Sequence, residues 1–91
     1  MSGNRNGRGS GDEKKDLLAR ICIDPNICFG KPCIRGHRIS VTMILDLLAS
    51  GWTVKEILDN YLGMEEADVL ACIAYGAKMT RTFEIALERQ L

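Results

Sequence analysis

The sequence predicts a mainly α-helical domain with a small N-terminal β element: a β-hairpin, two short helices joined by a tight turn, and a longer third helix. Three patterns lead to this prediction. Residues 30–41 are rich in glycine, proline and basic side chains, which is typical of turns between short strands. After residue 41 the apolar residues recur with the three- and four-residue spacing of helices. Residues 69–77 then form a run that is apolar on almost every side.

The chain has 91 residues, which is the size of one domain. Its 12 basic and 12 acidic residues cancel, so the overall charge does not favour a nucleic-acid binder, and any basic surface must come from local clustering. We find no signal peptide and no apolar run long enough to span a bilayer. We therefore expect a cytoplasmic protein without a membrane partner, whose four cysteines are reduced thiols.

Two parts are expected along the chain. Residues 1–15 are dominated by glycine, serine, asparagine and charged side chains, which bury little area, so we expect a flexible tail. A solvated leader is the simpler interpretation of this tail, and an arm that contacts phosphates or a partner is the alternative. Residues 16–91 are expected to form a single domain, the β-hairpin plus helix-turn-helix with its long C-terminal helix.

The β element is expected in the N-terminal half of this domain. Arg20–Ile23 has the pattern of a strand, and Asp24-Pro25-Asn26 ends it as a turn. Cys33-Ile34 and Arg38–Val41 are expected to pair as a hairpin. The turn between them is centred on Gly36, which we expect to take a positive φ.

The first helix is expected after Ser40, with Ser40 or Thr42 as its N-terminal cap. One face of this helix would carry the apolar residues Val41, Ile44, Leu45 and Leu48. Gly51 is placed to end the helix in the left-handed conformation, and Trp52 can fold back onto its last turn.

The second helix is expected from Thr53 to about Tyr61. Thr53 and Glu56 have the spacing of a capping box, in which each side chain accepts a hydrogen bond from the other residue's backbone N–H. The helical spacing is repeated by Val54, Ile57, Leu58 and Tyr61. We expect the helix to stop near Gly63.

The third helix is expected to begin near Glu65-Glu66, whose charges suit a helix N-terminus. Because residues 69–77 are apolar on nearly every side, this helix needs burial all round. We expect part of that burial to come from a second copy of the chain, which makes the protein a homodimer. The apolar stripe would be extended towards the C-terminus by Met79, Phe83, Ala86 and Leu87.

The first two helices and their glycine turn have the form of a helix-turn-helix. In a DNA-reading protein the second helix would enter the major groove, and Thr53, Lys55 and Asn60 are its candidate DNA contacts. Glu56 and Asp59 on the same helix would repel the phosphate backbone. A helix pair that only packs, with a solvated outer face, is therefore an equal alternative.

A second candidate site is the basic cluster of the hairpin, where Lys31, Arg35 and Arg38 stand beside His37. Pro32 and the neighbouring glycines would hold these side chains in a defined geometry. Contact with DNA phosphates and docking on an acidic partner are the two functional interpretations. A hairpin edge protected by charge, or an arginine bonded to carbonyl groups, is the structural alternative.

No catalytic residue, cofactor or metal is expected. The sequence has one histidine, no nucleophile in a recognisable elbow and no phosphate-binding loop, so we do not expect an enzyme. Cys22, Cys28, Cys33 and His37 are potential zinc ligands, but their spacing is not that of a zinc ribbon or finger.

From about residue 20 to 78 the sequence resembles the domain-of-unknown-function 433 family (DUF433). The resemblance rests on the long segment Gly30–Val41 and on shorter motifs around it. These motifs are Ile23-Asp24-Pro25, Leu47–Thr53, Glu56-Ile57-Leu58 with Tyr61, and Ala71–Ala77. The family usually has proline where this chain has Leu62, and threonine where it has His37.

The resemblance implies a homeodomain-like, three-helix helix-turn-helix preceded by a small β element. Members of the family resemble VapB-type antitoxins of type II toxin–antitoxin pairs, often encoded beside a PIN-like nuclease toxin. On this resemblance we expect an antitoxin that neutralises such a toxin and, bound to double-stranded DNA as a homodimer, represses transcription of its own operon. The alternative is a protein–protein interaction module of the same fold that does not bind DNA.

Overall fold

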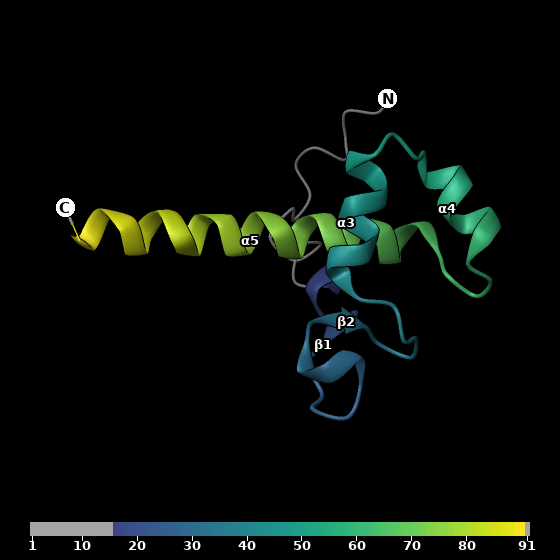
Figure 1. The fold of residues 1–91 in the computed structure, drawn as a ribbon, viewed down its shortest axis with the longest axis horizontal. Coiled ribbons are helices and arrows are strands. Elements are labelled where there is room, and N and C mark those ends of the chain that lie inside the picture. Colours follow the sequence, from purple (N-terminus) through teal and green to yellow (C-terminus); the bar gives the residue numbers. More distant parts are fainter. Residues whose placement is uncertain (1–15, 91) are drawn as a thin grey trace.

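The structure, a computed structural model, describes residues 16–90 as a short β element followed by three α-helices (Figure 1). The elements are β1 (Ile21–Cys22), the 3-10 turn η1 (Cys28–Gly30), β2 (Cys33–Ile34), α3 (Val41–Ala49), α4 (Val54–Asn60) and α5 (Glu66–Gln90). Residues 16–18 are helical as well. The mainly helical fold with a small β element is therefore confirmed, whereas the tail expected at residues 1–15 lies outside the described residues.

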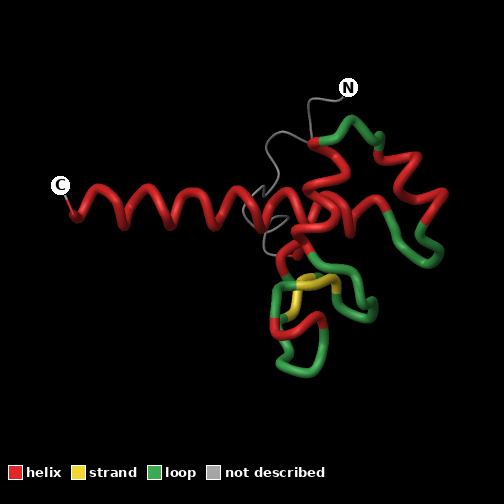
Figure 2. Tube along the Cα trace, viewed as in Figure 1, coloured by secondary structure: helices red, strands yellow, loops and turns green. Residues whose placement is uncertain are grey.

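The sheet consists of two short antiparallel strands at one end of the molecule (Figure 2). Its register places Ile21 opposite Ile34 and Cys22 opposite Cys33. The expected turn after β1 forms at Asp24, whose Oδ1 accepts a hydrogen bond from Asn26 N at 2.8 Å. This side-chain bond imitates a backbone turn and ends the strand.

The turn after β2 is the one expected from the glycine at position 36. Gly36 has a φ of 85°, and His37 N donates to Ile34 O at 2.9 Å. The expected hairpin strand at residues 38–41 is reduced to a single bridge at Ser40. Helix α3 begins directly after this bridge, so the chain leaves the sheet, and β1 supplies the strand that pairs with β2.

Helix α3 starts and ends at the expected signals. Ser40 Oγ caps the helix by accepting a hydrogen bond at 3.1 Å from the backbone N–H three residues on. At the other end Gly51 has a φ of 99°, and its N–H donates to Leu48 O at 3.0 Å. Trp52 N donates to Leu47 O, also at 3.0 Å. The last carbonyls of α3 are thereby satisfied in the Schellman pattern, with the glycine at its left-handed position.

Helix α4 begins in the expected capping box. Thr53 Oγ1 accepts from Glu56 N at 3.1 Å, and Glu56 Oε1 accepts from Thr53 N at 2.7 Å. The helix ends at Asn60, and Gly63, with a φ of 88°, lies in the turn towards α5. Residues 41–60 are therefore two helices separated by a bend, as expected.

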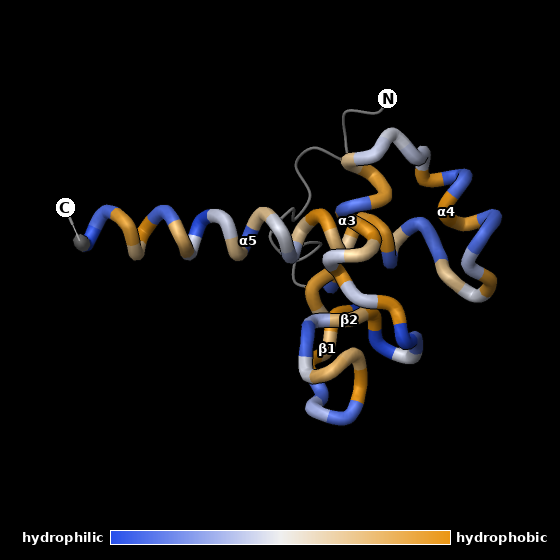
Figure 3. The backbone as a smooth tube through the Cα atoms, viewed as in Figure 1, coloured by the Kyte–Doolittle hydropathy of each residue, from blue (hydrophilic) through white to orange (hydrophobic). Residues whose placement is uncertain are grey.

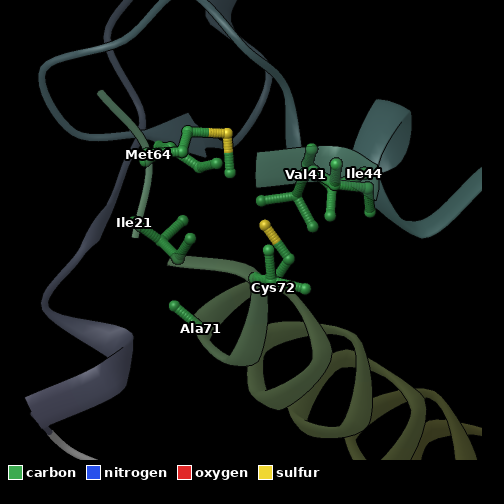
Figure 4. Close-up of a cluster of buried hydrophobic side chains, with 9 residues drawn as sticks. Ile21, Val41, Ile44, Met64, Ala71 and Cys72 are labelled. Carbon is green, nitrogen blue, oxygen red and sulfur yellow. The ribbon is translucent and has the colours of Figure 1, made fainter. Parts of the chain in front are cut away.

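The hydrophobic core lies where α3, α5 and β1 meet. Figure 4 shows Val41 and Ile44 of α3 facing Cys72 of α5, with Ile21 and Met64 completing the cluster. The large side chains that are fully buried are Ile34, Ile44, Ile57, Val69, Cys33 and Cys72. Every element except η1 thus contributes at least one fully or nearly fully buried side chain to one core.

Helix α5 runs past the core and projects from it (Figure 1). One side of its first turns is buried, with Asp68, Val69, Ala71 and Cys72, whereas residues 77–89 are exposed. Thr80 and Thr82 do not interrupt it, since their hydroxyls donate to carbonyl oxygens four residues earlier, at 2.9 and 3.0 Å. No helix within residues 16–90 is both long and apolar enough to cross a membrane.

Candidate functional site

The six residues proposed from the sequence as DNA contacts fall into two separate groups. Lys31, Arg35 and Arg38 flank β2, and the other three belong to α4 and its cap. Figure 1 places α4 and the strands on opposite sides of α5. The structure therefore does not bring the six residues together into one site.

The polar side chains of Thr53, Lys55 and Asn60 all bind other groups of α4 or its cap. The hydroxyl of Thr53 caps it, and the ammonium of Lys55 lies 3.0 Å from Asp59 Oδ2. Asn60 Nδ2 donates to Glu56 O at 2.8 Å. With the carboxylates of Glu56 and Asp59 exposed beside them, this helix presents a mixed rather than a cationic surface.

Arg35 is held by backbone carbonyl groups. Its Nε donates to Ala19 O at 3.0 Å and its Nη2 to Ile21 O at 3.3 Å. Its own backbone N–H donates to Arg20 O at 2.7 Å. The side chain therefore fastens the segment that leads into β1 onto the turn after β2, which matches the structural alternative considered for this cluster.

Lys31 and Arg38 remain as neighbouring exposed cations. Both line a pocket of about 300 Å³, which we call the Phe29 pocket. Its lining residues are Cys28, Phe29, Lys31, Arg38, Ser40 and Met43. Within residues 16–90, neither cation has a carboxylate oxygen at ion-pair distance, the ion pairs there being formed by Arg20 and Lys55. The pocket thus combines two available positive charges with an apolar wall.

Phe29 is the most exposed large apolar residue of the described chain, with 97% of its surface accessible. Its backbone is left-handed (φ 56°, ψ 34°), as are those of Cys28 (φ 51°) and Gly30 (φ 80°). Two hydrogen bonds of 3.0 Å, from Gly30 N to Ile27 O and from Lys31 N to Cys28 O, close this turn. A left-handed conformation costs a non-glycine residue about 1–2 kcal/mol, and such strain clusters at functional sites.

The aromatic ring at position 29 was not expected at the surface. Residues 27–29 are three consecutive apolar residues, a pattern that favours burial. Nothing local distinguishes a phenylalanine held out into solvent from one packed inward, because the difference depends on the left-handed turn of η1. The one available signal was the glycine at position 30, which permits such a turn.

The thiols of Cys22, Cys28 and Cys33 lie close together, and Cys28 also lines the Phe29 pocket. Cys22 Sγ and Cys33 Sγ lie 3.7 Å apart across the strand pair. Burial, together with hydrogen bonds to Cys22 and Cys28, raises the pKa of Cys33 to about 12. The ring of His37 lies against Gly63 instead. Within residues 16–90 no group of three or more histidine, cysteine or acidic side chains is arranged to hold a metal ion.

A family model described as a protein of unknown function, DUF433, matches residues 21–76, which is more than half of the chain. The chain belongs to the DUF433 family. The resemblance expected over about residues 20–78 is therefore confirmed, and every residue of the Phe29 pocket lies inside the matched part of this DUF433 protein.

A solved structure has the same fold. The crystal structure of a DUF433 member protein from Anabaena variabilis aligns with a TM-score of 0.65 and 22% sequence identity, covering 97% of this chain and 99% of that chain. No curated protein matches this DUF433 chain.

Proposed function

We propose that this DUF433 protein is an antitoxin-like regulator whose main activity is to bind another protein, a PIN-like nuclease toxin, through the Phe29 pocket. The observation that carries the proposal is Phe29 itself, a fully exposed aromatic ring held in place by a left-handed turn. Interface residues that contribute most to binding are often aromatic or arginine side chains surrounded by contacts that exclude water. Lys31 and Arg38 beside the ring would fit a partner surface that carries carboxylates.

The antitoxin role itself is supported by the resemblance to VapB-type proteins, and the proposal includes a homodimer as the binding-competent form.

The side-chain contacts of α4 support protein binding over DNA binding. In a helix that enters the major groove, Lys55 and Asn60 would have to leave the bonds they form with Asp59 and with their own helix. The exposed carboxylate of Glu56 would also face the phosphates.

A second candidate function is autorepression, in which the homeodomain-like domain binds double-stranded operator DNA. The observation that favours it is the pair of free cations, because Lys31 and Arg38 can contact phosphates without breaking an ion pair within residues 16–90. In this case the hairpin rather than α4 would make the main contacts with the duplex.

Titration of the full chain with the protein encoded beside it, by calorimetry, tests the first proposal. Phe29→Ala is expected to weaken binding by about 30-fold or more, as for other residues that dominate an interface. Leu62→Ala is the matched control, because Leu62 is 89% exposed and lies in the loop after α4. Tight binding that is unaffected by Phe29→Ala, or no binding at all, would overturn the proposal.

Titration with the upstream DNA at two salt concentrations tests the second candidate. A DNA reader is expected to bind less tightly at high salt, and Lys31→Ala or Arg38→Ala should each reduce the salt slope by about one. Phe29→Ala should leave DNA binding unchanged. Loss of binding in Lys55→Ala and Asn60→Ala, with normal folding, would instead assign the contacts to α4.

A further inference from the structure

Helix α5 carries one apolar stripe along its whole length, and only the first half of this stripe is covered by described residues. Val69 and Cys72 are fully buried, whereas Met79 is 45%, Phe83 62% and Leu87 46% exposed. Apolar or small residues recur in steps of three and four at positions 69, 72, 76, 79, 83 and 86. With 3.6 residues per turn this spacing keeps them on one face, as in a coiled coil.

The covered half shows which way this face points. A Cβ at Gly76 would lie 3.2 Å from Leu45 Cδ1, so Gly76 faces α3. Met79 and Phe83 follow at the same spacing and therefore continue the face that packs against α3. Figure 3 shows the same alternation of hydrophobic and hydrophilic residues along the projecting half of α5.

A partner that covers its apolar side chains would stabilise the projecting half of α5. Residues 77–89 are all exposed, and an isolated helix of fewer than about 12–15 residues is marginal in water. The apolar side chains Met79, Phe83 and Leu87 form a seam on this half. Its other faces are charged, with Lys78, Arg81, Glu84, Glu88 and Arg89.

We propose that this seam pairs with the same seam of a second copy of the chain, antiparallel, around a two-fold axis at Phe83. Met79 and Leu87 lie four residues before and after Phe83. An antiparallel copy therefore places Phe83 against Phe83 of the partner subunit and Met79 against the partner's Leu87. A surface that matches itself in this way is what a two-fold interface requires.

The position of the core selects the antiparallel arrangement. The residues of α5 that belong to the core lie in its N-terminal half, where α3 and the strands lie beside it (Figure 1). A parallel partner would bring a second core to the same level on the same face, where the first core already lies. In the antiparallel pair the two cores lie at opposite ends of the joined helices and do not collide.

The charges beside the seam favour the same arrangement. Lys78 and Arg81 stand on the near part of the projecting half, and Glu84 and Glu88 on its far part, where they outweigh Arg89. An antiparallel copy sets the basic part of one helix at the level of the acidic part of the other. A parallel copy would align like charges, which weakens helix pairing.

The pairing rests on the homodimer that the proposed function includes, and sedimentation equilibrium of the full chain tests it with neither toxin nor DNA present. At about 100 μM the wild-type chain is expected to be a dimer, and Phe83→Glu to weaken association by about 30-fold or more. Ile85→Glu is the matched control, because Ile85 is 52% exposed on the same helix but lies outside the seam. It should leave the dimer intact.

Both glutamate variants replace exposed side chains, so the core should keep its thermal melting temperature. A wild-type monomer at this concentration would overturn the proposal, and it is also the result expected if another segment of the same chain covers the seam. A dimer that tolerates Phe83→Glu would overturn it as well.

Cysteine cross-linking tests the direction of the pair. In the antiparallel register, position 79 of one copy lies beside position 87 of the other, whereas two residues at position 79 are about 12 Å apart along the axis. Met79→Cys and Leu87→Cys proteins should therefore each fail to form a new disulfide alone under mild oxidation, and should form one when mixed. A disulfide that links Met79→Cys to itself, or no mixed product, would overturn the antiparallel arrangement.

Discussion

Arg20 Nη1 lies 3.0 Å from Asp68 Oδ1, and this ion pair ties the segment before β1 to the first turn of α5. The carboxylate of Asp68 is 8% exposed, and its other oxygen accepts a hydrogen bond from Glu65 N at 2.9 Å. Hydrogen bonds with Glu65 and then with Asp68 raise the pKa of Arg20. The segment before β1 is therefore joined to the start of α5 through a carboxylate that is almost fully buried, whereas the side chain of Arg20 stays 38% exposed.

Asp68→Ala is expected to lower the free energy of unfolding by about 2 kcal/mol, because it removes charge-assisted hydrogen bonds to a side chain and to the backbone N–H at the start of α5. Asp59→Ala is the control, because the Lys55–Asp59 pair is exposed and should contribute less than about 1 kcal/mol. Urea unfolding measures both variants. Equal losses would show that the Arg20–Asp68 pair has no special structural role.

Gly36→Val is expected to destabilise the protein by about 1–2 kcal/mol. A side chain at position 36 would meet no atom within 4 Å, so the cost is that of a positive φ alone. Gly36→Asn should cost less, because asparagine tolerates the left-handed region better than a β-branched residue does. Thermal melting measures both variants. An unchanged melting temperature in Gly36→Val would show that the positive φ at position 36 does not limit stability.

The helix signals were readable from the sequence because their causes are local. The cap at Ser40, the capping box of Thr53 and Glu56, and the left-handed Gly51 all act within four residues. The positive φ of Gly36 belongs to the same class. Each of these features was predicted, and each is present.

The features that sequence reasoning missed depend on distant parts of the chain. Arg20 and Asp68 are 48 residues apart, and no local pattern pairs them. For Arg35 the sequence left DNA contact and bonding to carbonyl groups both open, and only the fold shows that its acceptors are carbonyl groups of a preceding segment. The exposure of Phe29 follows from a turn whose direction is set by its surroundings. The charge and apolarity of the sequence identified the candidate residues. Only the packing shows which of them stabilise the fold and which are exposed for binding.

Arg35→Ala is expected to lower the free energy of unfolding by about 1 kcal/mol, because two hydrogen bonds from its guanidinium are lost. Arg38→Ala is the matched control at the Phe29 pocket and should change stability by less than about 0.5 kcal/mol, as surface substitutions usually do. Chemical denaturation distinguishes the two. If both variants are equally stable, the side chain of Arg35 has no structural role and is available for binding, as Lys31 and Arg38 are.

Thiol labelling should divide the four cysteines into two classes. Cys22 and Cys28 are partly exposed, whereas Cys33 and Cys72 are buried. With an aromatic disulfide reagent near pH 8, two thiols per chain are expected to react rapidly and two only as fast as the protein opens. Mass spectrometry of the labelled peptides assigns the positions. Rapid labelling of Cys33 would show that β1 and β2 separate readily.

The two buried thiols should make the protein less stable in alkali. Burial raises the pKa of Cys33 to about 12 and that of Cys72 to about 11, the latter with a smaller contribution from the charge of Asp68, against an ordinary value of 9.0. In both cases the folded state holds its proton more tightly than the unfolded chain. Their contribution to stability is therefore complete below pH 9 and is lost as the pH rises towards 11–12.

Urea midpoints measured from pH 8 to 11 in the presence of a reductant should fall for the wild-type protein. The fall should be shallower in Cys72→Ala, because one of the two thiols that release a proton on unfolding is absent. Every other titrating group is common to both proteins, so the difference between the two curves isolates the thiol. Parallel curves would mean that Cys72 is as accessible to hydroxide in the folded protein as in the unfolded chain.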